Sequence, residues 1–238
     1  SVVENIIIEN KTDAPGLVIK IRPGTVGESV SIPACVTHGD IDDLVYNDFF
    51  VGENSDITIV AGCGVHTETG EPARHNGIHR FILGKGSKVK YVEKHYGEGD
   101  GDGKNVMNPH TVVYLAEGAY MEMETTQIKG IDSSNRVTKA ELKDNATFIV
   151  KEKLYTHGKQ VVDTDFVIDM NGENCTADIM SRSVAADHSK QNFVSTMNGN
   201  APCKGHTECD AIIIDDASVK AAPCLSANNV DAELIHEA

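Results

Sequence analysis

Three side chains near the carboxyl end of the sequence could bind a metal or carry sulfur: Cys203, His206 and Cys209. Thiolates and imidazoles are the ligands that zinc, copper and iron–sulfur clusters prefer. The spacing is not that of a zinc finger, and the second pair of ligands that a finger needs does not follow. In an extended strand Cys203 and Cys209 share one face, and His206 points the other way. A closed structural zinc site is therefore the weaker interpretation.

Cys209 lies between two acidic residues, Glu208 and Asp210, and a run of isoleucines follows it. The two carboxylates raise the cost of forming a thiolate, so iron or a cationic neighbour would have to compensate. The alternative role for Cys209 is that of a small buried hydrophobic residue, which is common for free cysteine.

The final segment, DAELIHEA, predicts a short strand that carries a second polar pair, His236 and Glu237. On that strand Leu234 and His236 share one face, and Ile235 and Glu237 share the other. A single exposed His-Glu pair is common on protein surfaces, so the interest of this pair comes from the cysteine-rich segments just before it.

A second group of metal-binding residue types lies earlier in the chain: Cys63, His66, His75 and His79. His75 and His79 have a spacing that chelates a metal well on a helix, but the intervening Asn76-Gly77 argues against a helix. We interpret these histidines as solvated loop residues and keep the group as a secondary metal candidate.

Short alternating segments rich in Val, Ile and Thr make up most of the chain and predict β-strands. They resemble one another as turn-plus-strand repeats without a strict period, at 52–60, 84–92, 116–124, 143–150, 171–180 and 215–225. The small residues at the turns would let successive coils stack closely, so we predict an all-β fold of stacked coils, a β-solenoid. An antiparallel sandwich or barrel is the alternative.

Two segments depart from this pattern. Residues 39–50 are a candidate helix, and 95–110, rich in Gly and Asp, is predicted to be an acidic surface loop. The loop lacks the spacing and the distal glutamate of an EF-hand calcium site.

The composition of the 238 residues limits the possible functions. Hydrophobic residues make up 40% and aromatic residues only 5%, with no Trp, so the core must be built from aliphatic side chains. The net charge of −15 argues against nucleic acid and anionic membranes as partners. No apolar run approaches the roughly 18 residues of a membrane span, and no signal peptide is evident. We therefore expect a cytoplasmic protein whose six cysteines stay reduced.

Motifs of the common enzyme classes are missing from the sequence. It has no G-x-S-x-G elbow, no Walker A loop and no Rossmann glycine fingerprint after a strand. A β-helix enzyme that cleaves polysaccharides with paired carboxylates is an alternative. Such enzymes stack sugars on aromatic side chains, which are scarce here.

Several features occur in one order over the last third of the chain: the segment 184–192 with His188, then Thr207-Glu208-Cys209-Asp210, the turn Asp215-Asp216, Pro223 and the closing His236-Glu237-Ala238. In this the chain resembles the SufB/SufD family, the scaffold proteins of the SUF system of iron–sulfur cluster assembly. The resemblance runs through much of the chain as weak repeats and is most specific over the last ~55 residues.

The resemblance implies a right-handed parallel β-helix as a single core domain over 1–238. It implies that Cys209 accepts sulfur and binds a transient iron–sulfur cluster, with Glu237 and the adjacent His236 as second ligand position. One thiolate with a harder ligand holds a cluster more loosely than four thiolates do, as a scaffold requires. The implied partners are a SufC-like ABC ATPase and a second SufB/SufD-type protomer, as a homodimer or heterodimer.

The sequence departs from the family pattern in three respects. The sequence stops at Ala238, before the helical tail that docks on the ATPase in the family, so we expect either a tail that was removed or is disordered or a protein that lacks that interface. The N-terminal helical region of larger members is also missing from the sequence, and we expect a compact member of the family. Cys224 stands where the family has no cysteine. With Cys203 it would enlarge the ligand set, or both would serve packing; His188 is a further candidate ligand.

We therefore predict a non-enzymatic scaffold for iron–sulfur cluster assembly. The alternatives are the carboxylate enzyme acting on carbohydrate and a structural interaction module with bound metal.

Overall fold

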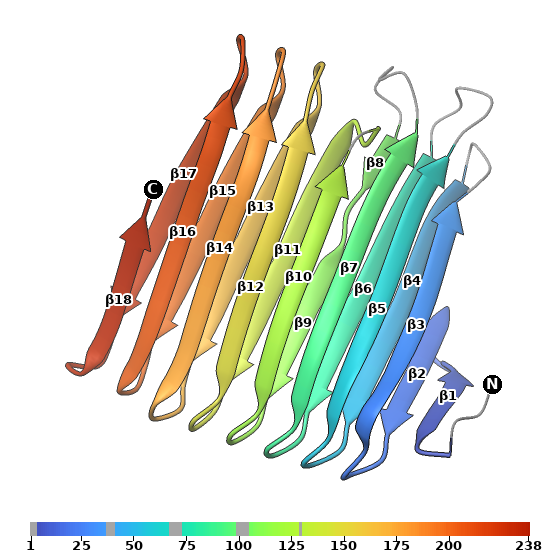
Figure 1. Ribbon diagram of the computed structural model, residues 1–238, viewed down its shortest axis with the longest axis vertical. Coiled ribbons are helices and arrows are strands. Elements are labelled where there is room, and N and C mark those ends of the chain that lie inside the picture. Colours follow the sequence, from blue (N-terminus) through green and yellow to red (C-terminus); the bar gives the residue numbers. More distant parts are fainter. Residues whose placement is uncertain (1–3, 37–40, 67–72, 99–104, 129) are drawn as a thin grey trace.

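The computed structural model describes residues 4–36, 41–66, 73–98, 105–128 and 130–238, with the backbone alone for 33–36, 41–43, 63–66, 73 and 98. The described chain is built from strands that lie side by side from the N-terminal to the C-terminal end (Figure 1). In chain order they are β1 (Ile6–Asn10), β2 (Gly16–Ile21), β3 (Val26–Val36), β4 (Ile41–Val51), β5 (Asp56–His66), β6 (Ala73–Leu83), β7 (Lys88–Glu98), β8 (Asn105–Met107), β9 (His110–Leu115), β10 (Tyr120–Ile128), β11 (Ser133–Leu142), β12 (Thr147–Thr156), β13 (Val161–Met170), β14 (Cys175–Ala185), β15 (Lys190–Gly199), β16 (Cys203–Ile213), β17 (Ser218–Ala227) and β18 (Ala232–Glu237).

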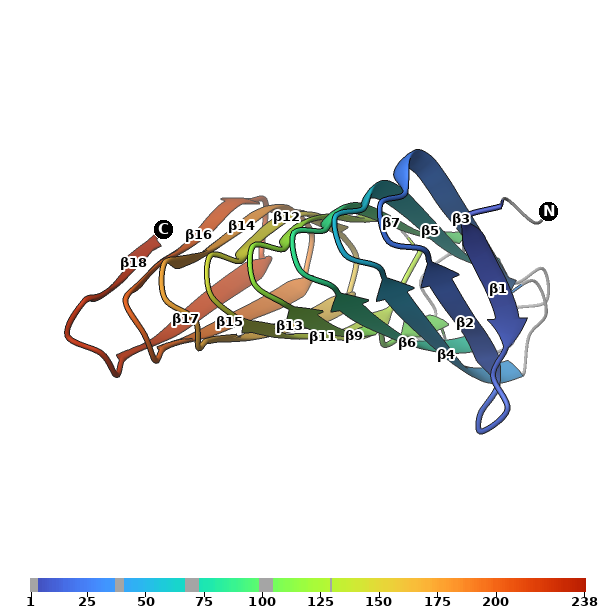
Figure 2. The ribbon, with the colours of Figure 1, turned by 90° about the horizontal axis from the view of Figure 1, so that it is seen from below.

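These strands form two sheets that face each other (Figure 2). One sheet contains β3, β5, β7, β10, β12, β14, β16 and β18, and the other contains β1, β2, β4, β6, β8, β9, β11, β13, β15 and β17. Most coils thus contribute one strand to each sheet, whereas β8 and β9 both lie between β6 and β11. All the pairs are parallel except β1 with β2. The predicted parallel β-solenoid is confirmed, and the sandwich or barrel alternative is wrong.

The core lies between the sheets and is filled by alternate residues of each strand. On β10 and β12, for example, every second side chain is buried. Residues in register stack along the axis, as the rings of Phe49 and Phe81 do with centroids 4.5 Å apart. Alternation in the sequence therefore becomes continuous rows of like side chains inside the solenoid.

One column of turns explains the repeated Gly and Asn. At each of these turns one residue adopts a left-handed conformation, with φ between 56° and 75°: Gly24, Asn54, Gly86, Gly118, Asn145 and Asn174. The residue that follows is small and at most 3% exposed: Thr25, Ser55, Ser87, Ala119, Ala146 and Cys175. Backbone amides link each turn to the next, such as Gly24 N to Glu53 O at 2.9 Å. Glycine and asparagine tolerate this conformation, so they recur wherever one coil leads into the next strand.

Two predictions about local structure are wrong. The candidate helix at 39–50 is strand β4 from Ile41 on, because its residues pair in register with β6. The predicted loop at 95–110 is strand at both ends, since β7 continues to Glu98 and β8 begins at Asn105. Residues 99–104, with the Gly-Asp repeat, lie outside the described residues.

Gly172 lies where two coils approach each other closely. A Cβ atom there would lie 1.9 Å from the carbonyl carbon of Lys143 and 2.0 Å from the amide nitrogen of Asp144. Gly172→Ala should therefore lower the free energy of unfolding by about 2 kcal/mol, because backbone cannot yield as a side chain would. Gly62→Ala is the matched control, since a Cβ at Gly62 would meet nothing within 4 Å. Urea unfolding of both variants tests this, and equal stability would contradict the close approach at Gly172.

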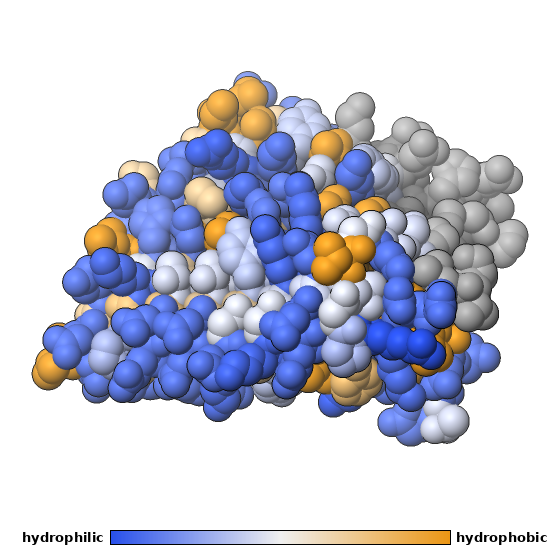
Figure 3. Space-filling view, turned by 60° about the horizontal axis from the view of Figure 1, so that its bottom comes forward, coloured by the Kyte–Doolittle hydropathy of each residue, from blue (hydrophilic) through white to orange (hydrophobic). Residues whose placement is uncertain are grey.

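The turn-bearing side of the molecule is mostly hydrophilic, with apolar side chains singly or in small groups (Figure 3). This agrees with the net charge of −15. The part of the chain that the structure describes contains no helix that could cross a membrane.

Candidate functional site

The strand β16 places its metal-binding residues on two opposite faces. Cys203 and Cys209 point into the solenoid and are buried, whereas His206 points outward and is half-buried. The prediction that Cys203 and Cys209 share one face and that His206 points the other way is confirmed. Cys203 and Cys209 are six residues apart, roughly 20 Å in a strand, so they cannot bind one metal together.

Cys209 ends a row of inward polar side chains that runs along the solenoid axis. Strand register places these residues next to one another in the order Glu93, Thr125, Glu152, Ser181 and Cys209. All five are at most 8% exposed. Since neighbouring strands lie about 4.8 Å apart, the row is roughly 19 Å long. A continuous row of buried polar side chains thus extends from the Cys209 thiol along the interior of the solenoid.

Glu152 sets the electrostatics around the thiol. It accepts a hydrogen bond from Ser181 at 2.9 Å, and a nitrogen of the Arg136 guanidinium lies 3.8 Å away. Arg136 is held in turn by the side-chain oxygen of Gln127, at 3.3 Å. Burial raises the pKa of Glu152, and the charge of Arg136 only partly offsets this.

Ionisation of the Cys209 thiol is strongly disfavoured. Its burial raises the pKa to about 11, and the nearby carboxylates of Glu152 and Asp210 add to the effect. The thiol is therefore neutral at physiological pH and becomes a thiolate only when a cation compensates for the charge.

The far end of the row carries an ion pair that is wholly inside the solenoid. Nε2 of His95 lies 2.7 Å from a carboxylate oxygen of Glu93. Burial alone raises the pKa of Glu93, but the charge and hydrogen bond of His95 outweigh it and lower the pKa to about 2. His79, also buried, lies close enough to contribute. A charged carboxylate therefore persists in the interior well away from Cys209.

Sequence reasoning missed this row, although the sequence contains a signal for it. The row members recur at intervals of 27 to 32 residues, which is one coil, at inward positions of alternating strands. Aligning the repeats by their turn residues would have placed Glu93, Glu152 and Cys209 in one column.

The closing strand β18 separates the two residues of the predicted second ligand position. His236 points inward opposite Thr207, two residues before Cys209 on the same face, and its Nδ1 is buried with no hydrogen-bond partner among the described residues. Glu237 points outward opposite Glu208. Within one chain, His236 and not Glu237 thus shares the interior with Cys209.

The other predicted ligands lie apart from Cys209. Cys203 is inward at the other end of β16, in register with the free thiol of Cys175. Cys224 lies on the outer face of the opposite sheet, paired with Thr196 of β15. His188 is an exposed turn residue, with Nδ1 3.7 Å from a carboxylate oxygen of Asp216 in the next coil. The structure therefore does not bring these three side chains into one ligand set.

The secondary candidate group is only partly described. The side chains of Cys63 and His66 lie outside the described residues. His75 and His79 are inward on β6, 4% and 6% exposed, so their interpretation as solvated loop residues is wrong. The Nε2 atoms of His75 and His79 lie close to Gly77, which stands between them on the strand. They are 3.6 Å and 3.3 Å, respectively, from the position that a Cβ atom of residue 77 would occupy.

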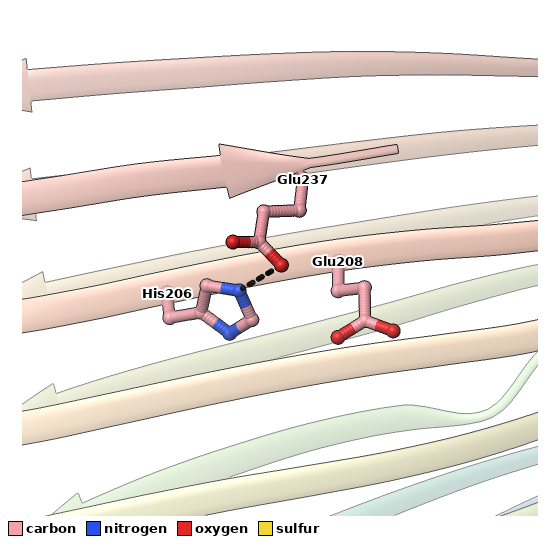
Figure 4. Close-up of side chains that lie close together, drawn as sticks. All are labelled: His206, Glu208 and Glu237. Carbon is pink, nitrogen blue, oxygen red and sulfur yellow. Dashed lines mark ion pairs between the residues drawn. The ribbon is translucent and has the colours of Figure 1, made fainter.

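On the outer face, three side chains that the sequence analysis had not combined lie together: His206, Glu208 and Glu237 (Figure 4). One ligand atom from each lies within 4.8 Å of the others. His206 Nδ1 donates to Asp178 at 2.8 Å, and its Nε2 lies 3.5 Å from Glu237. Alternation along β16 and β18 would have predicted that all three side chains point outward. The register of the two strands, which places Glu237 beside Glu208, does not follow from alternation alone.

Comparison with known sequences relates the chain to one family. The sequence model of the SUF system FeS cluster assembly SufBD core domain matches residues 47–238. An iron–sulfur cluster assembly SufBD family protein of Methanocaldococcus jannaschii is 30% identical over 205 residues, which is 85% of this chain and 64% of the relative. A SufBD family protein of Archaeoglobus fulgidus is 27% identical over 229 residues, 95% of this chain and 60% of the relative.

A SufBD family protein of Methanothermobacter thermautotrophicus is 26% identical over 237 residues, covering 97% of this chain and 56% of the relative. The chain thus spans between 56% and 64% of the length of these three relatives. The matched region contains both faces of β16 and β18 and extends well upstream of the segment that carried the resemblance. With a family model covering more than half of its length, the chain belongs to the SufBD family of iron–sulfur cluster assembly proteins.

Proposed function

We propose that this protein is a scaffold on which iron–sulfur clusters are assembled and from which they are passed on. Its membership of the SufBD family supports a role in cluster assembly. The observation that carries the finer proposal is the position of Cys209. The paired part of β18 ends at Glu237, opposite Glu208, so Cys209 is the first residue of β16 that β18 leaves uncovered.

The chemistry of Cys209 suits reversible binding of a cluster. A neutral thiol with pKa about 11 does not hold iron, but iron that arrives displaces the proton and binds the thiolate. The buried Nδ1 of His236 is an available second donor on the same inner face. A cluster held by one thiolate and one imidazole is bound more weakly than one held by four thiolates, so it can be released to an acceptor.

The polar row supports the delivery of reactants to this thiol. An interior lined by Glu152, Ser181 and Thr125 solvates polar species that an aliphatic core would exclude. Sulfur bound to Cys209 as a persulfide, or protons released when iron binds, would therefore find hydrogen-bonding partners. We propose that the row serves the assembly reaction and is not a packing feature alone.

The proposal includes partners and a compartment. A SufC-like ABC ATPase would supply the energy, since we propose that this chain acts without enzymatic activity of its own. A second SufB/SufD-type protomer would cover the last coil, where Leu225 and Leu234 on the inner faces of β17 and β18 remain half-exposed. We place the work in the cytoplasm, because cluster assembly needs thiols that stay reduced.

Anaerobic reconstitution tests the proposed function. The wild-type protein, incubated with ferrous iron and sulfide and then desalted, should retain both iron and acid-labile sulfide. Mixed with an apo-ferredoxin, it should transfer them and restore the visible spectrum of the ferredoxin. Retention of iron without sulfide, or a cluster that no acceptor can remove, would contradict the scaffold and favour a metal-binding module.

A further inference from the structure

We propose that His206, Glu208 and Glu237 form a binding site for one divalent first-row transition-metal ion on the outer face of β16 and β18. The site is distinct from the thiol site, because the sheet lies between the outward side chains and the inward Cys209. Figure 4 shows the Glu237 carboxylate turned toward the His206 imidazole, with the Glu208 side chain beside them.

The distances suit two ligands of one metal better than a hydrogen bond. His206 Nε2 lies 3.5 Å from a carboxylate oxygen of Glu237, beyond the usual 2.7–3.2 Å of a hydrogen bond. Two ligand atoms at ~2.1 Å from a tetrahedral ion are about 3.4 Å apart. The third ligand atom, from Glu208, lies within 4.8 Å of both. Binding of one ion by all three groups would require rotation of the Glu208 side chain.

The imidazole is oriented as metal-binding histidines are. Its Nδ1 lies 2.8 Å from Asp178 Oδ1, and since a carboxylate can only accept, Nδ1 carries the proton. In the neutral imidazole the lone pair is then on Nε2, which faces Glu237. A carboxylate behind the ring fixes this tautomer and makes the metal-binding nitrogen more basic.

The charges of the strands give an independent reason for a cation. Glu208 and Glu237 are direct neighbours in the register of β16 and β18, and like charges in that relation destabilise a sheet. The basic partner of Glu208 is Arg182, at 4.0 Å and largely exposed. Glu122, on β10 of the same sheet, is a useful comparison because its side chain is 19% exposed, as that of Glu208 is. The ammonium nitrogen of Lys151 lies 2.6 Å from a carboxylate oxygen of Glu122. The pair at the end of the solenoid thus lacks the close lysine that neutralises Glu122.

One imidazole and two carboxylates suit iron, manganese, cobalt or zinc as divalent ions, and leave coordination positions open. That ferrous iron is the physiological ion rests on the proposed function, whereas the existence of the site does not. If the ion is ferrous iron, the outer face of β16 would bind iron, and the inner face of the same strand would carry the sulfur on Cys209.

Cobalt(II) titration under argon tests the site. The Cys209→Ala protein should bind one cobalt ion per chain, with visible d–d absorption but no near-ultraviolet thiolate band, and its melting temperature should rise. Both His206→Asn and Glu208→Gln should weaken binding at least ~10-fold and abolish the rise in melting temperature. The matched control Glu122→Gln should bind as tightly as its parent.

Equal cobalt affinity in His206→Asn and its parent, or no binding by the parent, would overturn the proposal. The outcome is independent of the scaffold function, since the titration contains no sulfide and the parent lacks the Cys209 thiol. Loss of sulfide retention by the wild type would count against the scaffold and leave the cobalt result standing.

Discussion

Cys209→Ala is expected to lose nearly all retained iron and acid-labile sulfide after anaerobic reconstitution, whereas the wild type retains both. The physical reason is the ligand set inside the solenoid. Cys209 supplies the one inward thiol near His236, and the imidazole alone is too weak a ligand to hold a cluster through desalting. The measurement is iron and labile sulfide per chain, together with the visible absorption of the cluster.

Cys175→Ala is the matched control for this loss. Cys175 is buried as Cys209 is, but it occupies the turn column in which Ala119 and Ala146 stand in the two preceding coils. Alanine therefore fits the position, and cluster loading should remain at the wild-type level. If Cys209→Ala loads as fully as Cys175→Ala does, Cys209 is a packing residue, and Cys63 with His75 and His79 becomes the next candidate group.

Arg136→Met should destabilise the protein by about 3–5 kcal/mol, the largest effect on stability that we expect from one substitution. The Glu152 carboxyl is fully covered, and Arg136 is the cation that stabilises its charge. Without the guanidinium the carboxylate must either stay charged in the interior or take up a proton. Urea unfolding at pH 7 gives the loss directly, and Arg182→Met, an exposed arginine, should change stability by less than ~0.5 kcal/mol.

The pH dependence identifies the cause of that loss. Burial already raises the folded pKa of Glu152 above its ordinary 4.5, and removing Arg136 raises it further. A carboxyl with a raised folded pKa destabilises the fold most above that pKa, and the penalty disappears as pH falls toward the unfolded value. The deficit of Arg136→Met should therefore shrink from pH 7 toward pH 4.5. A deficit that is constant over this range would mean lost packing and not an unpaired charge.

The fold was predictable because its determinants are local in the sequence. Alternation predicts strands, and the small residues after Gly and Asn turns predict coils that stack closely, as Ser55, Ser87 and Ala119 do. The segment 39–50 is a strand from Ile41 on and not the expected helix, because its pairing with β6, which is not local in the sequence, decides its conformation. Register between coils is not local, and the signal for it in the sequence is the alignment of the turn residues from one repeat to the next.

The same limit applies to the site. The faces of Cys203, His206 and Cys209 followed from alternation alone and were correct. That Glu237 lies beside Glu208, and His236 beside Thr207, depends on where β18 docks on β16. The isoleucines after Cys209 are 45–63% exposed, and the pairing of β18 with β16 extends only to Glu208.

Each coil contacts the coils next to it. The stability of the molecule is therefore a sum of contributions from single coils and from the interfaces between adjacent coils. Among the described residues each interior coil has neighbours on two sides, and the coil of β17 and β18 packs on the coil of β15 and β16. Opening of the β17–β18 coil alone breaks that one interface and leaves the earlier coils in place. Glu237 and His236 belong to the β17–β18 coil, and Cys209 belongs to the coil beneath it. Opening of the last coil would therefore remove an imidazole or a carboxylate from a bound ion while the thiol stays in place. Release of cargo would then need no wider unfolding of the solenoid.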